Sequence, residues 1–135
     1  AESRDVIFSM ETGQETAQLL RTTLDELSSP SLKVNFDPAN MILYDMGNPI
    51  EAIELLGADI VHVHAKDASP PAEKGQWGTE LPLGEGDVGM TAFVQALDSA
   101  GYRGPLVVER EVGDQSERVR DIRSGIGVLR GVVGS

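Results

Sequence analysis

The stretch DIVHVHAKD, residues 59–67, decides how the chain is organised. Its first part, Asp59–Val63, has the length and the β-branched residues of a buried strand, and polar residues follow at once. Successive side chains of a strand point to opposite faces, so Ile60 and the two histidines are expected on one face. Val61 and Val63 are expected on the other face, against covering helices.

Three further apolar runs of strand length repeat this organisation: Val6–Met10, Leu32–Phe36 and Pro105–Val108. Helical periodicity and capping residues predict helices over Gln14–Leu27, from Asn48 to Gly57, over Thr91–Ala100 and from about Ser116 onward. Glycines inside the last pattern each cost about 1 kcal/mol relative to alanine, so its final turns are expected to fray. The repeated strand–helix order predicts an α/β fold with a parallel sheet and right-handed crossovers.

Four strand–helix units make half of an eight-stranded (β/α) barrel. We therefore expect residues 1–135 to form a single domain, a half-barrel. Such a piece has two open strand edges and an exposed apolar sheet face. The chain is then expected to be a fragment, to pair with another copy or with a missing half, or to form a small open sheet. Its first residues look like an internal start, so any upstream targeting segment would be lost.

The one long connection, Ala68–Met90, contains Trp77 and the glycine-rich stretch Leu83–Asp87. Loops of this length in compact domains are usually functional, and the alternative is a solvated insertion.

An acid or an imidazole stands at the end of every predicted strand: Glu11, Asp37, His64 and Glu109. The carboxyl ends of parallel strands meet at one edge of a sheet, so these side chains are expected to lie together. Close carboxylates repel one another by about 4 kcal/mol per pair at an effective dielectric constant of about 20, so a divalent cation is the simplest partner. Three oxygen ligands and one imidazole favour Mn²⁺, Mg²⁺ or Co²⁺ over a structural zinc site.

Two more polar residues share the face of His64. His62 lies one layer deeper and is expected to be a hydrogen-bonded core residue. Lys66 is expected either to reach a substrate oxygen or phosphate, or to pair with Asp67 or another acid.

Composition narrows the classes of function. A net charge of −11 repels phosphate backbones, so no nucleic-acid partner is expected. There is no cysteine, which excludes disulfides and thiolate metal sites. No apolar run reaches the roughly 18 residues of a membrane span. We expect no membrane partner and a cytoplasmic location.

Several motifs, in this order, resemble the xylose-isomerase-like sugar phosphate isomerase/epimerase family. They are Val34-Asn35-Phe36-Asp37-Pro38-Ala39-Asn40, His64-Ala65-Lys66-Asp67, Leu83-Gly84-Glu85-Gly86 and Val108-Glu109. The resemblance runs over nearly the whole chain. It implies a TIM barrel, of which this chain is the C-terminal half, strands five to eight.

The resemblance also implies that Glu11, Asp37, His64 and Glu109 bind a divalent metal, Mn²⁺ first and Mg²⁺, Co²⁺ or Zn²⁺ as alternatives. Glu11 and Glu109 would be the catalytic pair that flanks a small-molecule sugar or sugar phosphate. One carboxylate removes the proton next to the ketose carbonyl, which gives an enediolate, and the other returns a proton to the opposite face. An isomerase would instead move the proton between C1 and C2 on one face.

Asn40, Lys66 and Trp77 are the expected substrate-binding residues. Some ketose epimerases of the family have a histidine where this chain has Asn40, whose amide can bind a sugar hydroxyl but cannot titrate near neutrality. Trp77 is expected to pack on a sugar ring, or otherwise to anchor its loop to the scaffold.

The sequence leaves two alternative functions. An apurinic-endonuclease-like DNA repair enzyme would need a histidine-rich multi-zinc cluster and a basic groove, and two histidines and a charge of −11 argue against it. A non-catalytic half-barrel that still binds metal is the other, because strands one to four supply much of the family's substrate pocket.

Overall fold

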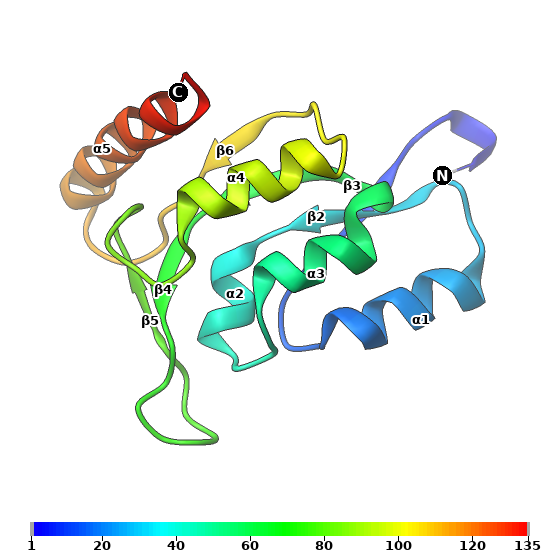
Figure 1. The fold of residues 1–135 in the computed structure, drawn as a ribbon, viewed down its shortest axis with the longest axis horizontal. Helices are drawn as coiled ribbons and strands as arrows, with labels where there is room; N and C mark the ends of the chain where they lie inside the picture. Colours follow the sequence, from blue (N-terminus) through cyan, green and yellow to red (C-terminus); the bar gives the residue numbers. More distant parts are fainter. Residues whose placement is uncertain (1, 135) are drawn as a thin grey trace.

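The computed structural model describes residues 2–134, and its central feature is a parallel sheet (Figure 1). The sheet has four strands in the order β1 (Phe8–Glu11), β2 (Leu32–Phe36), β3 (Ile60–Ala65) and β6 (Leu106–Val108). Each strand runs parallel to its neighbours. The predicted α/β fold with a parallel sheet is therefore confirmed.

Helices follow the strands and cover one face of the sheet. They are α1 (Ala17–Leu27), α2 (Pro38–Leu43), α3 (Pro49–Leu56), α4 (Met90–Ser99) and α5 (Gln115–Val133), with short 3-10 helices η1 (Glu2–Arg4) and η2 (Gly57–Asp59). In Figure 1, α1, α3 and α4 lie over the sheet and α5 lies beside β6. Among residues 2–134, no helix combines the length and the apolar character that a membrane crossing requires.

The core lies between the sheet and these helices. Val34 and Phe36 of β2 are fully buried there, and the Phe36 ring stacks on Phe93 of α4 at a centroid distance of 5.9 Å. The residues that alternate with them, Lys33 and Asn35, are only partly buried. They stand on the uncovered face with the two histidines of β3, so this face is more polar than the sequence suggested.

A bulge interrupts β3 at its start. Val34 pairs with Ile60 whereas the next residue, Asn35, pairs with His62, so Val61 is the extra residue. Val61 is 39% exposed and Ile60 is buried in the core. The prediction that Ile60 shares the histidine face and Val61 packs on helices is therefore wrong, because the bulge breaks the period of two.

The long connection contains a hairpin that the sequence did not reveal. Strands β4 (Asp67–Ser69) and β5 (Thr79–Leu81) pair antiparallel, with Ala68 opposite Glu80. In Figure 1 the hairpin extends away from the main sheet. Helix α2 was also missed, although Asp37 caps it and Pro38 opens it just as Asn48 and Pro49 do for α3.

Other boundaries shift by a few residues. Strand β1 begins at Phe8, whose N–H group donates to Ser31 O at 2.8 Å, and Val6 and Ile7 lie outside the sheet. Helix α1 begins at Ala17 with Thr16 as its cap. The final turns of α5, expected to fray, remain helical to Val133, and a capping box between Asp114 and Glu117 stabilises the start of this helix.

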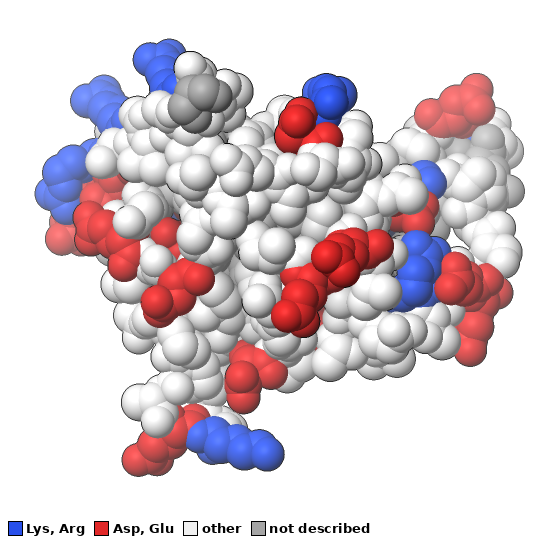
Figure 2. Space-filling view, viewed as in Figure 1, with Lys and Arg blue, Asp and Glu red and all other residues white. Residues whose placement is uncertain are grey.

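Charge is distributed unevenly over the surface. Figure 2 shows acidic side chains across the middle of the helical face, in the region of α3, and basic side chains mainly at its margins. Glu51 and Glu54 of α3 are both exposed. This face is therefore predominantly acidic in its middle.

Helix α5 approaches β6 closely at Gly125. A Cβ atom added there would lie 3.0 Å from Val108 Cγ1 and 3.1 Å from Leu83 Cβ. Gly127, two residues on, is exposed and would meet nothing within 4 Å. The two glycines therefore have different roles in one helix.

Gly127→Ala is expected to raise the free energy of unfolding by up to about 1 kcal/mol through helix propensity. Gly125→Ala gains the same propensity but crowds Val108 and Leu83, at a cost of about 1–3 kcal/mol, so it is expected to be less stable than Gly127→Ala. Urea unfolding of both variants measures the difference. Equal gains in stability would contradict the close packing at Gly125.

Candidate metal centre

The ends of the four parallel strands bring the predicted ligand residues together. Glu11 is the last residue of β1, Asp37 follows β2 as the cap of α2, His64 lies in β3, and Glu109 directly follows β6. One ligand atom from each residue lies within 4.8 Å of the others. The arrangement is therefore close enough for one ion to be shared.

The two glutamates come from the two edge strands, yet both reach the imidazole on β3. His64 Nδ1 lies 2.7 Å from Glu11 Oε1 and 3.4 Å from Glu109 Oε2. Glu109 follows the strand next to β3, whereas the Glu11 side chain reaches His64 from β1, across β2.

The depth of the four side chains differs strongly. The exposed fraction is 0% for Asp37, 18% for His64, 31% for Glu109 and 43% for Glu11. Asp37 thus forms the floor of the centre, and the glutamates form its solvent side.

Asp37 shows how well the group suits a cation. Its Oδ1 accepts a hydrogen bond from Asn40 N at 3.1 Å, but its buried Oδ2 has no hydrogen-bond partner among the described residues. Burial raises the pKa of Asp37 to about 6, against the opposing charge of Lys66. Buried polar atoms are normally hydrogen-bonded. A carboxylate oxygen that has no hydrogen bond, only the Lys66 ammonium 3.5 Å away, and that lies next to three other donors fits a divalent metal ligand.

Thr12 fixes the backbone of Asp37. Its buried hydroxyl donates to Asp37 O and accepts from Asp37 N, both at 2.8 Å. Thr12 was not among the predicted site residues, although its position directly after Glu11, at the end of a strand, indicated a place near the site.

Lys66 is buried among acids. Its Nζ lies 3.2 Å from Glu109 Oε2, 2.5 Å from Glu111 Oε2 and 3.5 Å from Asp37 Oδ2, and the residue is 2% exposed. Burial alone would lower the pKa of Lys66, but the charges of Asp37, Glu111 and Glu109 outweigh it and the pKa is raised. The structure therefore shows ion pairs with these three acids.

The expectation that Lys66 pairs with Asp67 or another acid is confirmed for other acids and not for Asp67. The buried Asp67 carboxylate instead accepts backbone N–H groups from Ala68, Gly84 and Val88, at 3.0, 2.9 and 3.1 Å. The reason is strand alternation, which turns neighbouring side chains to opposite faces.

An amide links the two histidines. Asn35 Oδ1 lies 2.8 Å from His62 Nδ1, and Asn35 Nδ2 lies 3.5 Å from His64 Nε2. The histidine rings meet edge to face, 5.3 Å apart. His62 is hydrogen-bonded as predicted, but it is only partly buried and lies on the uncovered face, so the prediction of a core residue is wrong. Asn35 was not among the predicted site residues, although it stands on the same face of the next strand.

The other expected substrate residues are placed differently. The amide of Asn40 donates to Thr12 O at 3.1 Å and accepts from Lys66 Nζ at 3.2 Å, so it borders the centre. Trp77 is 71% exposed and meets the Tyr44 ring edge to face, at a centroid distance of 5.4 Å. Trp77 and Tyr44 line a cavity of about 360 Å³ together with Gln14, which follows β1.

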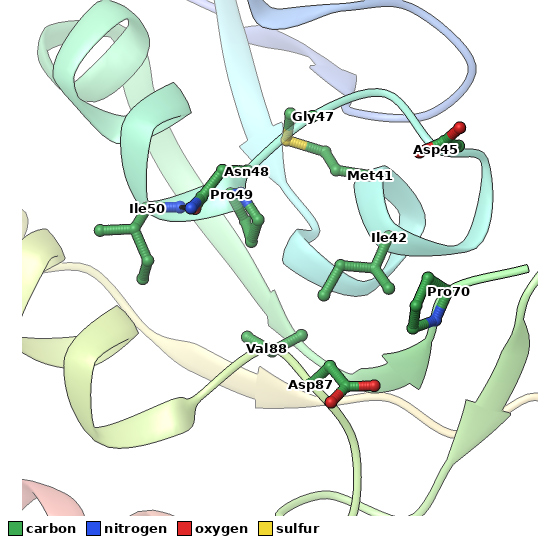
Figure 3. Close-up of a pocket in the computed structure, with 10 residues that line it drawn as sticks. All are labelled: Met41, Ile42, Asp45, Gly47, Asn48, Pro49, Ile50, Pro70, Asp87 and Val88. Atoms are coloured by element: carbon green, nitrogen blue, oxygen red, sulfur yellow. Dashed lines mark hydrogen bonds between the residues drawn. The ribbon is translucent and has the colours of Figure 1, made fainter.

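A separate cavity of about 320 Å³ lies between α2, the start of α3 and the long connection (Figure 3). Its wall includes Asp45, Asn48, Pro70 and Asp87, and Figure 3 shows Asp45 at the upper right of the view and Asp87 beside Val88 at its lower edge. None of the four predicted metal ligands lines this cavity. The acidic centre at the strand ends is thus a different place.

Comparisons with known proteins agree with this architecture. A xylose isomerase domain protein from Planctomyces limnophilus is 42% identical, with a TM-score of 0.93 over 98% of this chain and 48% of its own. A D-tagatose 3-epimerase-like protein is 23% identical, with a TM-score of 0.76 over 99% and 49%. A xylose isomerase-like TIM barrel protein from Mycobacterium smegmatis, solved in complex with magnesium, is 16% identical, with a TM-score of 0.76 over 97% and 45%.

The chain spans about half the length of these three proteins. The family model described as xylose isomerase-like TIM barrel matches residues 1–132. The four-stranded parallel sheet of this chain corresponds to half of such an eight-stranded barrel. The chain therefore belongs to the xylose isomerase-like TIM barrel family.

Proposed function

We propose that the chain supplies the metal centre and both proton-transferring glutamates of a sugar or sugar phosphate isomerase or epimerase. The observation that carries the proposal is the convergence of Glu11, Asp37, His64 and Glu109 within 4.8 Å. Membership of the xylose isomerase-like family and the likeness to a D-tagatose 3-epimerase-like protein support it.

Glu11, Asp37, His64 and Glu109 would hold a divalent cation. Three carboxylates and one imidazole suit Mn²⁺ first, with Mg²⁺, Co²⁺ or Zn²⁺ as alternatives. The magnesium complex of the Mycobacterium smegmatis relative supports a divalent ion of this kind. When bound, such an ion polarises a sugar carbonyl and so acidifies the neighbouring C–H group.

The two glutamates would carry the proton. They are the more exposed members of the group, so a sugar can reach them, whereas Asp37 lies too deep. Glu11 Oε1 and Glu109 Oε2 face His64, which leaves each carboxylate a second oxygen for the substrate. One glutamate removes the proton next to the carbonyl, and the other returns a proton to the opposite face of the resulting enediolate.

Substrate contacts are proposed at the border of the centre. Asn40 would bind a sugar hydroxyl, and Lys66 would act through its contacts with Asn40 and Glu109. Trp77 is exposed enough to pack on a sugar ring. The open edges at β1 and β6 would be covered by an N-terminal half-barrel or by another copy, which would complete the pocket.

The glutamates provide the first test. With Mn²⁺ and a panel of ketoses in heavy water, NMR is expected to show loss of the signal of the proton next to the carbonyl. Glu11→Gln and Glu109→Gln should each reduce this exchange at least about 100-fold. Glu54→Gln, on exposed α3, is the matched control and should keep the wild-type rate. Metal binding without exchange in any ketose would favour the non-catalytic half-barrel instead.

His64→Ala is expected to weaken Mn²⁺ affinity at least about tenfold, because it removes the imidazole donor of the group. Titration calorimetry measures the affinity. Unchanged affinity in this variant would exclude His64 as a ligand.

The raised pKa of Asp37 predicts a pH dependence of metal binding. Mn²⁺ must displace a proton from Asp37 below about pH 6, so affinity should fall as the pH drops through that value. The metal-free fold should respond in the opposite sense. It should become more stable as the pH falls from about 6 toward 3.8, because the folded state binds this proton more tightly. Affinity that is constant between about pH 5 and pH 7 would contradict the role of Asp37.

A further inference from the structure

The segment that carries Glu109 leaves the sheet immediately after β6. Glu109 N donates to Ala65 O at 3.1 Å, and this is where strand pairing with β3 ends. The next residues, Arg110 and Glu111, belong to no strand. Other contacts must therefore fix the conformation of these residues, and with it the direction in which the Glu109 side chain points.

Lys66 holds the carboxylates of Glu109 and Glu111, and a second buried side chain, Glu80, holds the backbone of this segment. Glu80 Oε1 accepts a hydrogen bond from Glu111 N at 2.9 Å and from Arg110 Nη1 at 2.8 Å. The same guanidinium donates through Nε to Asp121 on α5, at 3.0 Å. Backbone and side chain are thus both held on the C-terminal side of Glu109.

Glu80 is in turn held by the hairpin. It stands opposite Ala68 in the β4–β5 pair. The neighbouring Asp67 holds the loop that follows β5 through the backbone N–H groups of Gly84 and Val88. Gly86 lies against this carboxylate so closely that an added Cβ would be 2.3 Å from Asp67 Oδ1. The hairpin is therefore fastened to the end of β3, just beyond His64.

We propose that Glu80 is a positioning residue for Glu109. A series of contacts then connects the end of β3, through the β4–β5 hairpin, to the segment that carries Glu109. Glu80 is not among the residues whose ligand atoms converge, so it acts through Arg110 and Glu111. This inference rests on the proposed function, because it takes Glu109 to be a metal ligand and a proton carrier.

Mn²⁺ titration of the chain tests the proposal. Glu80→Ala leaves Glu111 N without its acceptor and should weaken affinity about tenfold, the effect of an outer-shell partner. Glu80→Gln keeps an acceptor without the charge and should recover most of the affinity. Glu85→Ala is the matched control, since Glu85 is exposed in the loop that follows β5. Wild-type affinity in Glu80→Ala would overturn the proposal.

A double-mutant cycle separates positioning from general loosening of the fold. In a Glu109→Gln background, Glu80→Ala should cause little further loss of Mn²⁺ affinity, because the residue that it positions has already changed. An equal loss in both backgrounds would show a merely structural role and overturn the assignment. Amide hydrogen exchange gives a readout without metal, in which the Glu111 amide should lose protection in Glu80→Ala but not in Glu85→Ala.

The outcomes also separate this inference from the proposed function. If the chain binds Mn²⁺ and the cycle behaves as expected, but no ketose exchanges its proton, the isomerase or epimerase activity fails and the role of Glu80 stands. If exchange occurs and Glu80→Ala binds Mn²⁺ as the wild type does, the activity stands and the role of Glu80 fails.

Discussion

The structure depends on balancing negative charge at one end of a parallel sheet. Strand geometry brings Glu11, Asp37 and Glu109 to the same edge, and Glu111 follows directly. Lys66, almost fully enclosed, supplies one positive charge within reach of three of these acids. An ammonium alone leaves the group negative and one Asp37 oxygen without a donor. A divalent cation would complete both the charge balance and the coordination.

The sequence predicted the fold well because burial on a parallel sheet leaves a strong signal. Leu32–Phe36 was predicted to the residue, since its apolar side chains and polar end coincide with a complete strand. The bulge at Val61 was not predictable from periodicity, because it arises from pairing with β2. The strands of the hairpin were not predictable because, unlike the equally short β6, they contain no run of apolar residues.

The ligand residues of the candidate centre were predictable from their positions along the chain, whereas the residues that hold them in place were not. A polar residue at a strand end can be read along the chain, and all four expected ligands lie close together. Asn35, Thr12 and Glu80 act through partners that are distant in sequence, so their importance depends on which segments fold against each other. The acids that pair with Lys66 were likewise determined by strand alternation, which favoured Glu109 and Glu111 over the adjacent Asp67.

The fastening of the hairpin at its base has a consequence for how this enzyme family can diversify. Asp67 and Glu80 hold the two strands of the hairpin at its base, while the stretch from Pro70 to Trp77 is largely exposed. Insertions, deletions and substitutions at the tip can therefore accumulate without displacing the groups at the strand ends. Evolution can therefore vary what the tip touches while the arrangement of residues beneath it is inherited unchanged.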